Sequence, residues 1–202
     1  MMTKRKKHNL FIGVYVALLL LVSVIAADCS GTAGKKGKVY PKVDLPQPIY
    51  SMTPDTLPFR FGISDQAVFS ARKNKEGEYF CDIIYPLLNA QLYCTWHRIS
   101  PERFPLMAEE SHKLAYPHTA IATGINEKLY ENDLVHVYGI LYDIKGDVAT
   151  PLQVALTDSS SYFFNASLYF NATPNADSIA PTLDYIRKDV IHLMESYVSV
   201  KH

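Results

Sequence analysis

The segment from Tyr162 to Tyr197 constrains the fold more than any other part of this 202-residue chain, because it pairs a strand with a long helix. Two sets of side chains alternate at the start of this segment. The drier set is Tyr162, Phe164, Ala166, Leu168 and Phe170, and the wetter set is Phe163, Asn165, Ser167, Tyr169 and Asn171. A period of two predicts a strand with one apolar face and one wetter face.

A helix is expected directly after this strand. Residues 173–176 interrupt the alternation, and Asp177 or Ser178 can cap a helix. Apolar residues then recur at spacings of three and four, namely Ile179, Leu183, Ile186, Val190, Leu193, Met194 and Tyr197. Such a stripe packs most simply on the sheet that contains the preceding strand. Pro181 is expected in the first helical turn, where its missing N–H costs no hydrogen bond.

Residues 79–97 are predicted to form a β-hairpin, because two strand-like runs flank a loop of composition Pro-Leu-Leu-Asn. If the last residue of the first strand faces the first residue of the second, the register pairs Tyr85 with Ala90, Ile83 with Leu92, Cys81 with Cys94 and Tyr79 with Trp96. A directly opposed pair at a non-hydrogen-bonded position comes close enough to form a disulfide. Cys81 and Cys94 are therefore predicted either as a disulfide or as two buried free thiols.

The rest of the chain carries signals for further strands and one more helix. Ser100 can cap a helix with Pro101 at its first position, and the helix is expected to run to about Ala115 and to resume to Thr123. Strands are expected at Phe59, Phe61 and Ile63, at Leu134 to Ile144, and at Leu152, Val154 and Leu156, with turns at 145–147 and 158–161. Consecutive strands joined by short turns are antiparallel.

The predicted fold class is therefore α+β. We expect a single domain with one antiparallel β-sheet of five to seven strands and with helices packed on it. A length of 202 residues is sufficient for one such domain with its own core. An α/β/α sandwich of the Mog1/PsbP kind would suit this order of elements.

The N-terminus has the pattern of an export signal. Lys4 to Lys7 form a basic cluster, and Leu10 to Ala27 form an apolar run. Cys29 follows Ile25-Ala26-Ala27-Asp28, which resembles the cleavage site of a lipoprotein, in which the cysteine is lipidated and becomes the new N-terminus. Asp28 stands where such sites have a small residue, so cleavage after Ala26 or Ala27 is an alternative. A run of this length is also compatible with an uncleaved membrane anchor.

The predicted organisation has three parts. Residues 1–28 are the signal peptide, residues 29–58 are a tether followed by an extended Pro-rich arm, and residues 59–202 are the globular domain. Loss of residues 1–28 removes four of 20 basic and one of 20 acidic residues, leaving 16 against 19 and a charge near −3. This charge argues against nucleic acid as a partner.

No catalytic or metal-binding signature stands out, and we expect no cofactor, no metal and no enzymatic activity. Glu109 and His112 share the Glu-x-x-His type of spacing with Asp189 and His192, but a di-iron bundle needs two more carboxylate-bearing helices. On a helical wheel, one stripe of the last helix lies well away from its core stripe, and it consists of Tyr185, Asp189, His192 and Ser196. We interpret this stripe either as a docking face for a partner protein or as a plain exposed face.

Four segments carry a family resemblance: SLYFNATPNADSIAPTLDYIRKDVIHLMES, VYGILYDIKGDVATPLQ, the HKLAYPHT run and IIYPLLNAQLYCTW. They resemble the gliding motility lipoprotein GldD of gliding Bacteroidetes, and the likeness covers roughly residues 40 to 197. The resemblance implies a non-enzymatic envelope lipoprotein of the gliding machinery and the linked type IX secretion system. Its partners would be other envelope proteins of that machinery and, through the lipid on Cys29, a membrane. No acidic run follows Cys29, which favours the periplasmic side of a membrane.

A second function belongs to a different class. A periplasmic domain of this size can bind a small ligand, or act as an enzyme, in a cleft between its sheet and its helices. His112, His118 and Trp96 are the residues that such a function would use. An acid–histidine cluster in a deep pocket would favour this hypothesis, whereas a flat exposed patch would favour docking to a protein.

Overall fold

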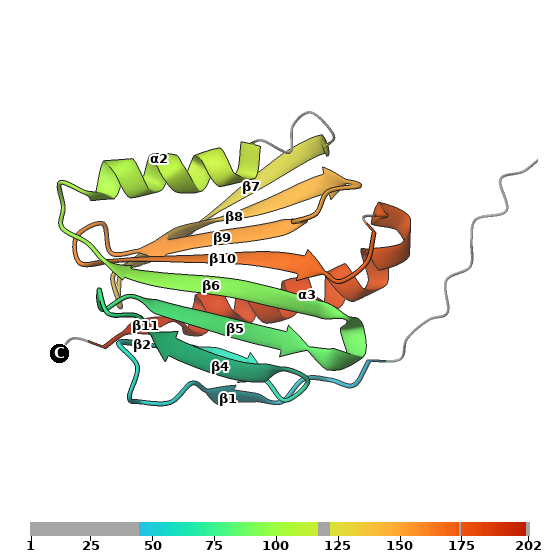
Figure 1. Cartoon of the computed structure of the whole chain (residues 1–202), viewed down its shortest axis with the longest axis horizontal. Helices are drawn as coiled ribbons and strands as arrows, with labels where there is room; N and C mark the ends of the chain where they lie inside the picture. The colour runs from blue at the N-terminus through green and yellow to red at the C-terminus, as the bar shows by residue number, and fades with distance from the viewer. Residues whose placement is uncertain (1–44, 117–121, 174, 201–202) are drawn as a thin grey trace, which may run out of the picture. The chain divides into compact units, whose positions relative to one another are not determined.

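A computed structural model describes residues 45–116, 122–173 and 175–200 of the chain. Most of its elements are labelled in Figure 1. They are β1 (Tyr50–Met52), β2 (Phe59–Arg60), β3 (Gly62–Ser64), β4 (Val68–Lys73), β5 (Tyr79–Tyr85), the 3-10 turn η2 (Pro86–Leu88), β6 (Ala90–Arg98), α2 (Phe104–Ala115), β7 (Ala122–Asn132), β8 (Val137–Gly146), β9 (Leu152–Thr157), β10 (Tyr162–Phe170), α3 (Ala176–Ser196) and β11 (Val198–Ser199). The predicted α+β class is confirmed.

The main sheet has seven antiparallel strands in the order β4-β5-β6-β10-β9-β8-β7. Strand β10 is central, because it joins the β4–β5–β6 side to the β7–β8–β9 meander. Two small sheets, β1-β3 and β11-β2, are added by segments from near the two ends of the described chain. The strand count lies within the predicted range of five to seven.

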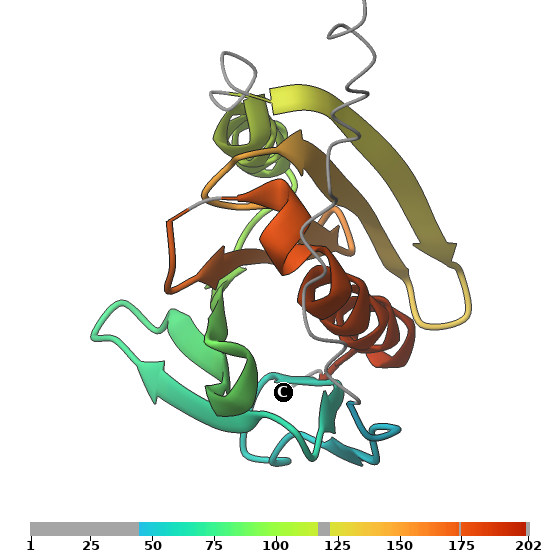
Figure 2. The ribbon, with the colours of Figure 1, turned by 90° about the vertical axis from the view of Figure 1, so that its right-hand side faces the viewer.

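Helices cover both faces of the sheet, with α2 in front of it and α3 behind it in Figure 1, and Figure 2 shows the two helices on opposite sides of the sheet. The alternation in β10 decides which residues meet which helix. Phe164 and Leu168 are buried in the main core with Ile186 of α3, whereas Phe163 is buried in a smaller core with Met107 of α2. The layers are therefore α/β/α, and the likeness to Mog1/PsbP stays a prediction.

The hairpin forms in the predicted register. Tyr85 pairs with Ala90 and Cys81 with Cys94 across β5 and β6. Asn89 closes the connection with a left-handed conformation, at φ 50°, which an asparagine side chain tolerates better than most. A local pattern sufficed here because two short strands and a tight loop leave few registers that bury the same face.

Helix α3 begins earlier than the sequence pattern indicated. Asn175, rather than Asp177 or Ser178, is the N-cap, and its side-chain oxygen accepts a hydrogen bond from the Ser178 N–H at 3.0 Å. Pro181 consequently lies in the second turn and not in the first, where it removes one hydrogen bond to the carbonyl of Asp177. The apolar stripe packs as predicted: Leu183, Ile186, Val190, Leu193, Met194 and Tyr197 are buried, and Ile179 is partly buried.

Two further predictions needed correction around α2. The helix starts at Phe104, after a turn in which the Ser100 carbonyl accepts hydrogen bonds from the N–H groups of Arg103 and Phe104. It ends at Ala115 as expected, but it does not resume to Thr123, because Ala122–Asn132 is strand β7. This long edge strand is mostly exposed, so its sequence lacks the apolar alternation that marks a half-buried strand.

Other differences are smaller. Strand β8 begins at Val137 rather than Leu134, because residues 133–136 form the turn and His136 adopts φ 52°. The predicted strand at 59–63 is divided between two small sheets, with β2 paired to β11 and β3 paired to β1. Strand β4 was not predicted, since five of its six residues are exposed at the sheet edge.

A leucine pair tests which side of β10 carries the core. Leu168 is fully buried, whereas Leu134 in the β7–β8 turn is 95% exposed. We expect Leu168→Ala to lower the free energy of unfolding by about 2–5 kcal/mol, because it removes buried methyl groups and leaves a cavity. Leu134→Ala is the matched control and should change it by about 0.5 kcal/mol or less. Urea denaturation measures both, and equal effects would contradict the assignment of faces.

Candidate functional site

The stripe of α3 that was interpreted either as a docking face or as a plain exposed face lies against the chain's own N-terminal arm. We call residues 45–64 the arm and their contact with Tyr185, Asp189, His192 and Ser196 the arm–helix contact. Tyr50 of β1 stacks on His192 with ring centroids 3.7 Å apart and an interplanar angle of 23°. The Tyr185 hydroxyl donates a hydrogen bond to the Pro46 carbonyl at 3.1 Å.

Asp189 is the charged centre of the arm–helix contact. It is only 5% exposed, and its Oδ1 accepts a hydrogen bond from the Tyr50 hydroxyl at 2.6 Å. Its other oxygen, Oδ2, is buried without a hydrogen-bond partner among the described residues. Burial raises the pKa of this carboxyl, and the hydrogen bond from the Tyr50 hydroxyl offsets only part of that shift. The group is therefore held closer to its neutral form than an exposed aspartate.

Close backbone approach completes the contact at Gly62. The Gly62 N–H donates to the Ser196 Oγ at 2.8 Å, and that hydroxyl donates to the His192 carbonyl at 2.6 Å. A Cβ at position 62 would lie 2.5 Å from the His192 Nε2, so only glycine fits without displacing the ring. The helical wheel placed this stripe away from the core stripe, and it could not show that the arm covers it.

The arm also changes the predicted division of the chain. The described residues from Leu45 onward belong to one compact unit. The extended segment that was expected to reach residue 58 is therefore packed on the domain over its last part, where β1 pairs with β3. Residues 1–28, with the predicted signal peptide, and Cys29 lie outside the described residues.

The two cysteines of the hairpin are buried free thiols in the structure. The Glu78 carbonyl accepts from Asn74 on the β4 side, and the Asn89 carbonyl accepts from Asn171 on the β10 side. The backbone N–H and C=O groups of successive strand residues point to alternate neighbouring strands. Counting from Glu78 and from Asn89, the backbone groups of Cys81 point toward β6 and those of Cys94 point toward β5. The two cysteines therefore form a hydrogen-bonded pair.

A disulfide was expected only if Cys81 and Cys94 were opposed at a non-hydrogen-bonded position, and they are not. Opposed Cβ atoms of a hydrogen-bonded pair lie toward the wide end of a range of about 4.5–5.5 Å. A disulfide needs roughly 3.5–4.5 Å between them. Burial raises the pKa of Cys81 to about 12 and that of Cys94 well above its ordinary value, which disfavours the reactive thiolate of both.

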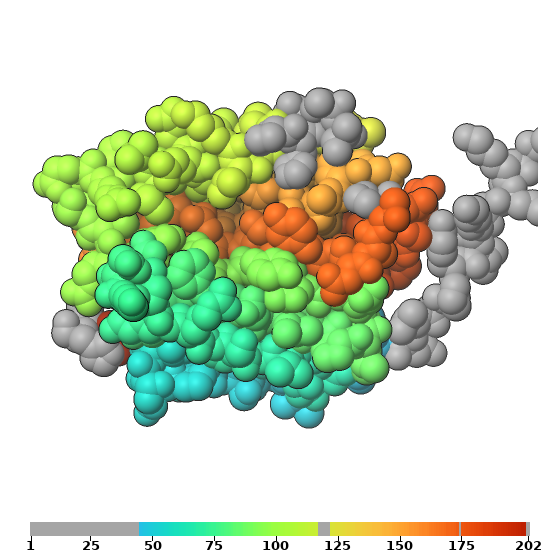
Figure 3. Space-filling model, viewed as in Figure 1, coloured from blue at the N-terminus to red at the C-terminus, as the bar shows by residue number. Residues whose placement is uncertain are grey.

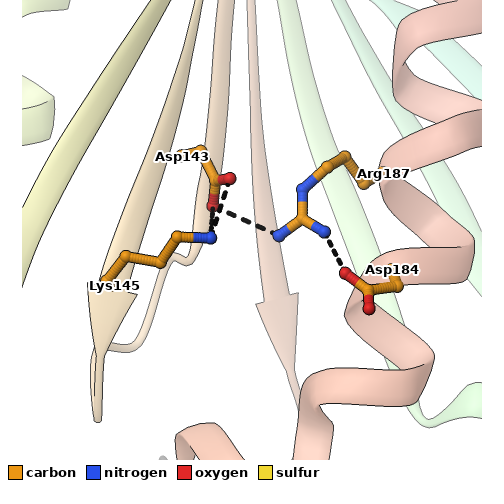
Figure 4. A network of polar contacts seen from close by, with 4 residues as sticks. All are labelled: Asp143, Lys145, Asp184 and Arg187. Carbon is orange, nitrogen blue, oxygen red and sulfur yellow. Dashed lines mark hydrogen bonds and ion pairs between the residues drawn. The ribbon is translucent and has the colours of Figure 1, made fainter.

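A charged network that the sequence did not indicate joins α3 to β8 (Figure 4). Asp143 is buried and accepts from the Lys145 Nζ at 2.9 Å and from the Arg187 Nη2 at 3.2 Å, and Arg187 also pairs with Asp184. A cavity of about 530 Å³ lies beside this network, with Ile144, Pro151 and Leu183 among its lining residues. Both cations are already paired with carboxylates, so the network serves to hold α3 on the sheet.

The residues that an enzymatic cleft would use are not brought together. Glu109 pairs with Lys113 at 2.6 Å on the exposed side of α2, and His112 stacks on Tyr116 at 4.1 Å. Trp96 is buried in the main core on the opposite side of the sheet. His118 lies outside the described residues. In the described ranges, no three His, Cys, Asp or Glu side chains are grouped as metal ligands would be.

Thiol chemistry tests the hydrogen-bonded pairing of the cysteines. We expect an alkylating agent without reductant to modify Cys81 and Cys94 only after denaturation, because both side chains are buried and carry raised pKa values. Peptide mapping by mass spectrometry identifies each modified position. A cross-linked peptide containing both residues would contradict the prediction of free thiols.

The pH dependence of stability tests Asp189. A carboxyl whose pKa is raised by folding favours the folded state at low pH, and this contribution is lost as pH rises through the raised value. Asp189→Asn should therefore match the wild type near pH 3.5 and become increasingly more stable than it toward pH 7.5. Urea titrations across this range measure the difference. The exposed Asp55→Asn is the control, and a gap for Asp189→Asn that does not vary with pH would refute the assignment.

The comparisons with known proteins agree with the resemblance seen in the sequence. A protein family described as gliding motility lipoprotein GldD matches residues 31–198, and no curated protein matches the chain. Within the described ranges, neither helix combines the length and the apolar character needed to cross a bilayer. The family match covers the arm, both helices and ten of the labelled strands in full. The chain therefore belongs to the gliding motility lipoprotein GldD family, which indicates a role in gliding motility and a membrane-anchored place in the cell envelope.

Proposed function

We propose that this protein is a lipid-tethered, non-enzymatic component of the gliding machinery and of the linked type IX secretion system. In this proposal a lipid on Cys29 holds the domain at a membrane, facing the periplasm. The domain then acts through contacts with other envelope proteins of the same machinery. The family assignment supports the motility role and the anchoring, and the arm–helix contact supports the tethering mechanism.

The observation that carries the proposal is the packing of the arm along α3. Only 15 residues separate Cys29 from Leu45, the first described residue of the compact unit. Even fully extended, they span at most about 55 Å. If the chain were free from Cys29 up to residue 58, as the sequence predicted, it could span roughly 100 Å. The arm–helix contact therefore halves the reach of the domain, which raises its effective concentration near partners at the same membrane.

The same contact supports a non-enzymatic role. Asp189 and His192 are the acid and the histidine that sequence spacing marked for chemistry, and both are engaged with Tyr50. Because the arm occupies this helix face, partner contacts are expected on the remaining surface of the domain. The stripe then acts on partners indirectly, by fixing where the tether leaves the domain.

A gene deletion with complementation tests the proposal. Cells without the gene should neither move on a surface nor secrete cargo into the medium, because motility depends on exported adhesins in this proposal. A wild-type copy should restore both, and a Cys29→Ala copy should restore neither. Ser30→Ala, at the neighbouring position, is the matched control and should behave as the wild type.

Each other outcome removes a defined part of the proposal. Normal secretion without movement would exclude the link to the secretion system and leave a role in the motility drive. Normal movement and secretion in the deletion strain would exclude the family function for this chain. Full activity of the Cys29→Ala copy would exclude lipid tethering, provided that immunoblotting shows equal protein levels.

A further inference from the structure

A groove lies between α2 and the front face of the sheet, on the side opposite α3. It encloses about 520 Å³, which is within the range of small-ligand sites. Strands β6 and β10 form its floor, and α2 forms one wall. Figure 3 shows this face hollowed between the yellow-green surface of α2 and the green surface of the β4–β5–β6 side, with orange β10 residues between them. Its lining residues are Tyr93, Thr95, His97, Met107, Glu110, Ser111, Leu114, Asn165, Ser167 and Tyr169.

The floor of the groove presents neutral polar groups in a row. Thr95 pairs with Asn165, and Tyr93 pairs with Ser167, across β6 and β10. The Ser111 hydroxyl donates to the Asn165 Oδ1 at 2.9 Å, which leaves the Asn165 amide N–H groups as free donors. In the part of the chain that the structure describes, the hydroxyls of Thr95 and Ser167 have no protein partner either. These three side chains offer donors and acceptors to a ligand.

Two tyrosine rings close one end of the groove. The centroids of Tyr93 and Tyr169 are 5.4 Å apart, and their planes meet at 80°. Tyr93 is 48% exposed and Tyr169 is 39% exposed, so ring surface remains available to a bound molecule. Aromatic rings make favourable contacts with C–H groups, and their hydroxyls add hydrogen bonds at the rim.

The charges of the groove exclude an anionic ligand. Neither lysine nor arginine lines it, and Glu110 on the α2 wall would repel a phosphate or a carboxylate. His97 is paired with Glu78 at 2.7 Å, so its nearest charge is also negative. Glu110 can instead accept a hydrogen bond from a hydroxyl group of a neutral ligand.

We propose that this groove binds a short stretch of a neutral or N-acetylated glycan chain. A sugar ring combines an apolar C–H face, which suits the two tyrosines, with hydroxyl and amide groups, which suit the polar row and Glu110. The floor from Tyr93 to His97 is about 13 Å long, the scale of a short oligosaccharide. The proposal rests on the groove alone and does not depend on the role in gliding.

Calorimetric titration of the full-length chain in detergent tests this site with two defined probes, chitohexaose and maltohexaose. We expect saturable binding of at least one of them. Tyr93→Ala and Tyr169→Ala should each weaken that binding by about tenfold, because each removes an aromatic contact surface. Asn165→Ala should weaken it as well, through loss of the amide donors. The motility and secretion phenotypes test the proposed function independently of this titration. If neither probe binds, only the glycan proposal fails.

The controls use the same face of the sheet. Tyr138→Ala removes a tyrosine outside the groove lining and should leave the affinity unchanged. Tyr93→Phe keeps the ring and should retain most of the affinity. Circular dichroism must show an unchanged melting temperature for each variant, which is expected because Tyr93 and Tyr169 are not in the core. The proposal is overturned if neither glycan binds, or if binding is insensitive to both tyrosines.

Discussion

The packing of Tyr197 against aromatic rings of the arm and of β10 is the interaction on which the arrangement of the domain depends. Its ring centroid lies 5.4 Å from that of Phe164, 6.2 Å from Phe61 and 6.4 Å from Phe59. One cluster therefore joins the arm, the central strand and the end of α3, although these segments are far apart in the sequence. Burying such large rings supplies much of the apolar area that holds the arm in place. The arm that follows the proposed tether is thus held by the main core at its C-terminal end.

Sequence patterns predicted the elements whose signal is local. The β5–β6 register and the core stripe of α3 follow from periods of two and 3.6, and both are confirmed. Strand β7 was missed because an exposed edge strand needs no apolar alternation. In the candidate site, the spacing placed Asp189 and His192 on one stripe of the last helix, but what covers a stripe is decided by tertiary contacts. Tyr50 and Gly62 were missed because nothing near them in the sequence indicates the α3 residues that they contact, Asp189 and Ser196, which are 139 and 134 positions away.

The two faces of the sheet differ, and the difference follows from how much each helix covers. The face toward α3 is closed by apolar side chains of the main core and by the arm. The single helix α2 covers part of the other face, packing on Phe163 and leaving Thr95, Asn165 and Ser167 at the floor of an open groove. Strand β10 therefore has polar side chains on its face toward α2 and buried apolar side chains on its face toward α3.

Stability alone does not explain the buried carboxylate in the arm–helix contact. The free energy needed to desolvate Asp189 exceeds the free energy that one hydrogen bond contributes. Asp189 instead specifies the register of β1 on β3. A shift of β1 by one residue along β3 would turn Tyr50 to the opposite face and leave Asp189 without its hydroxyl donor. An apolar residue at position 189 would accept several arm positions about equally well. The single carboxylate therefore specifies one position of the arm, which fixes where the proposed tether meets the domain.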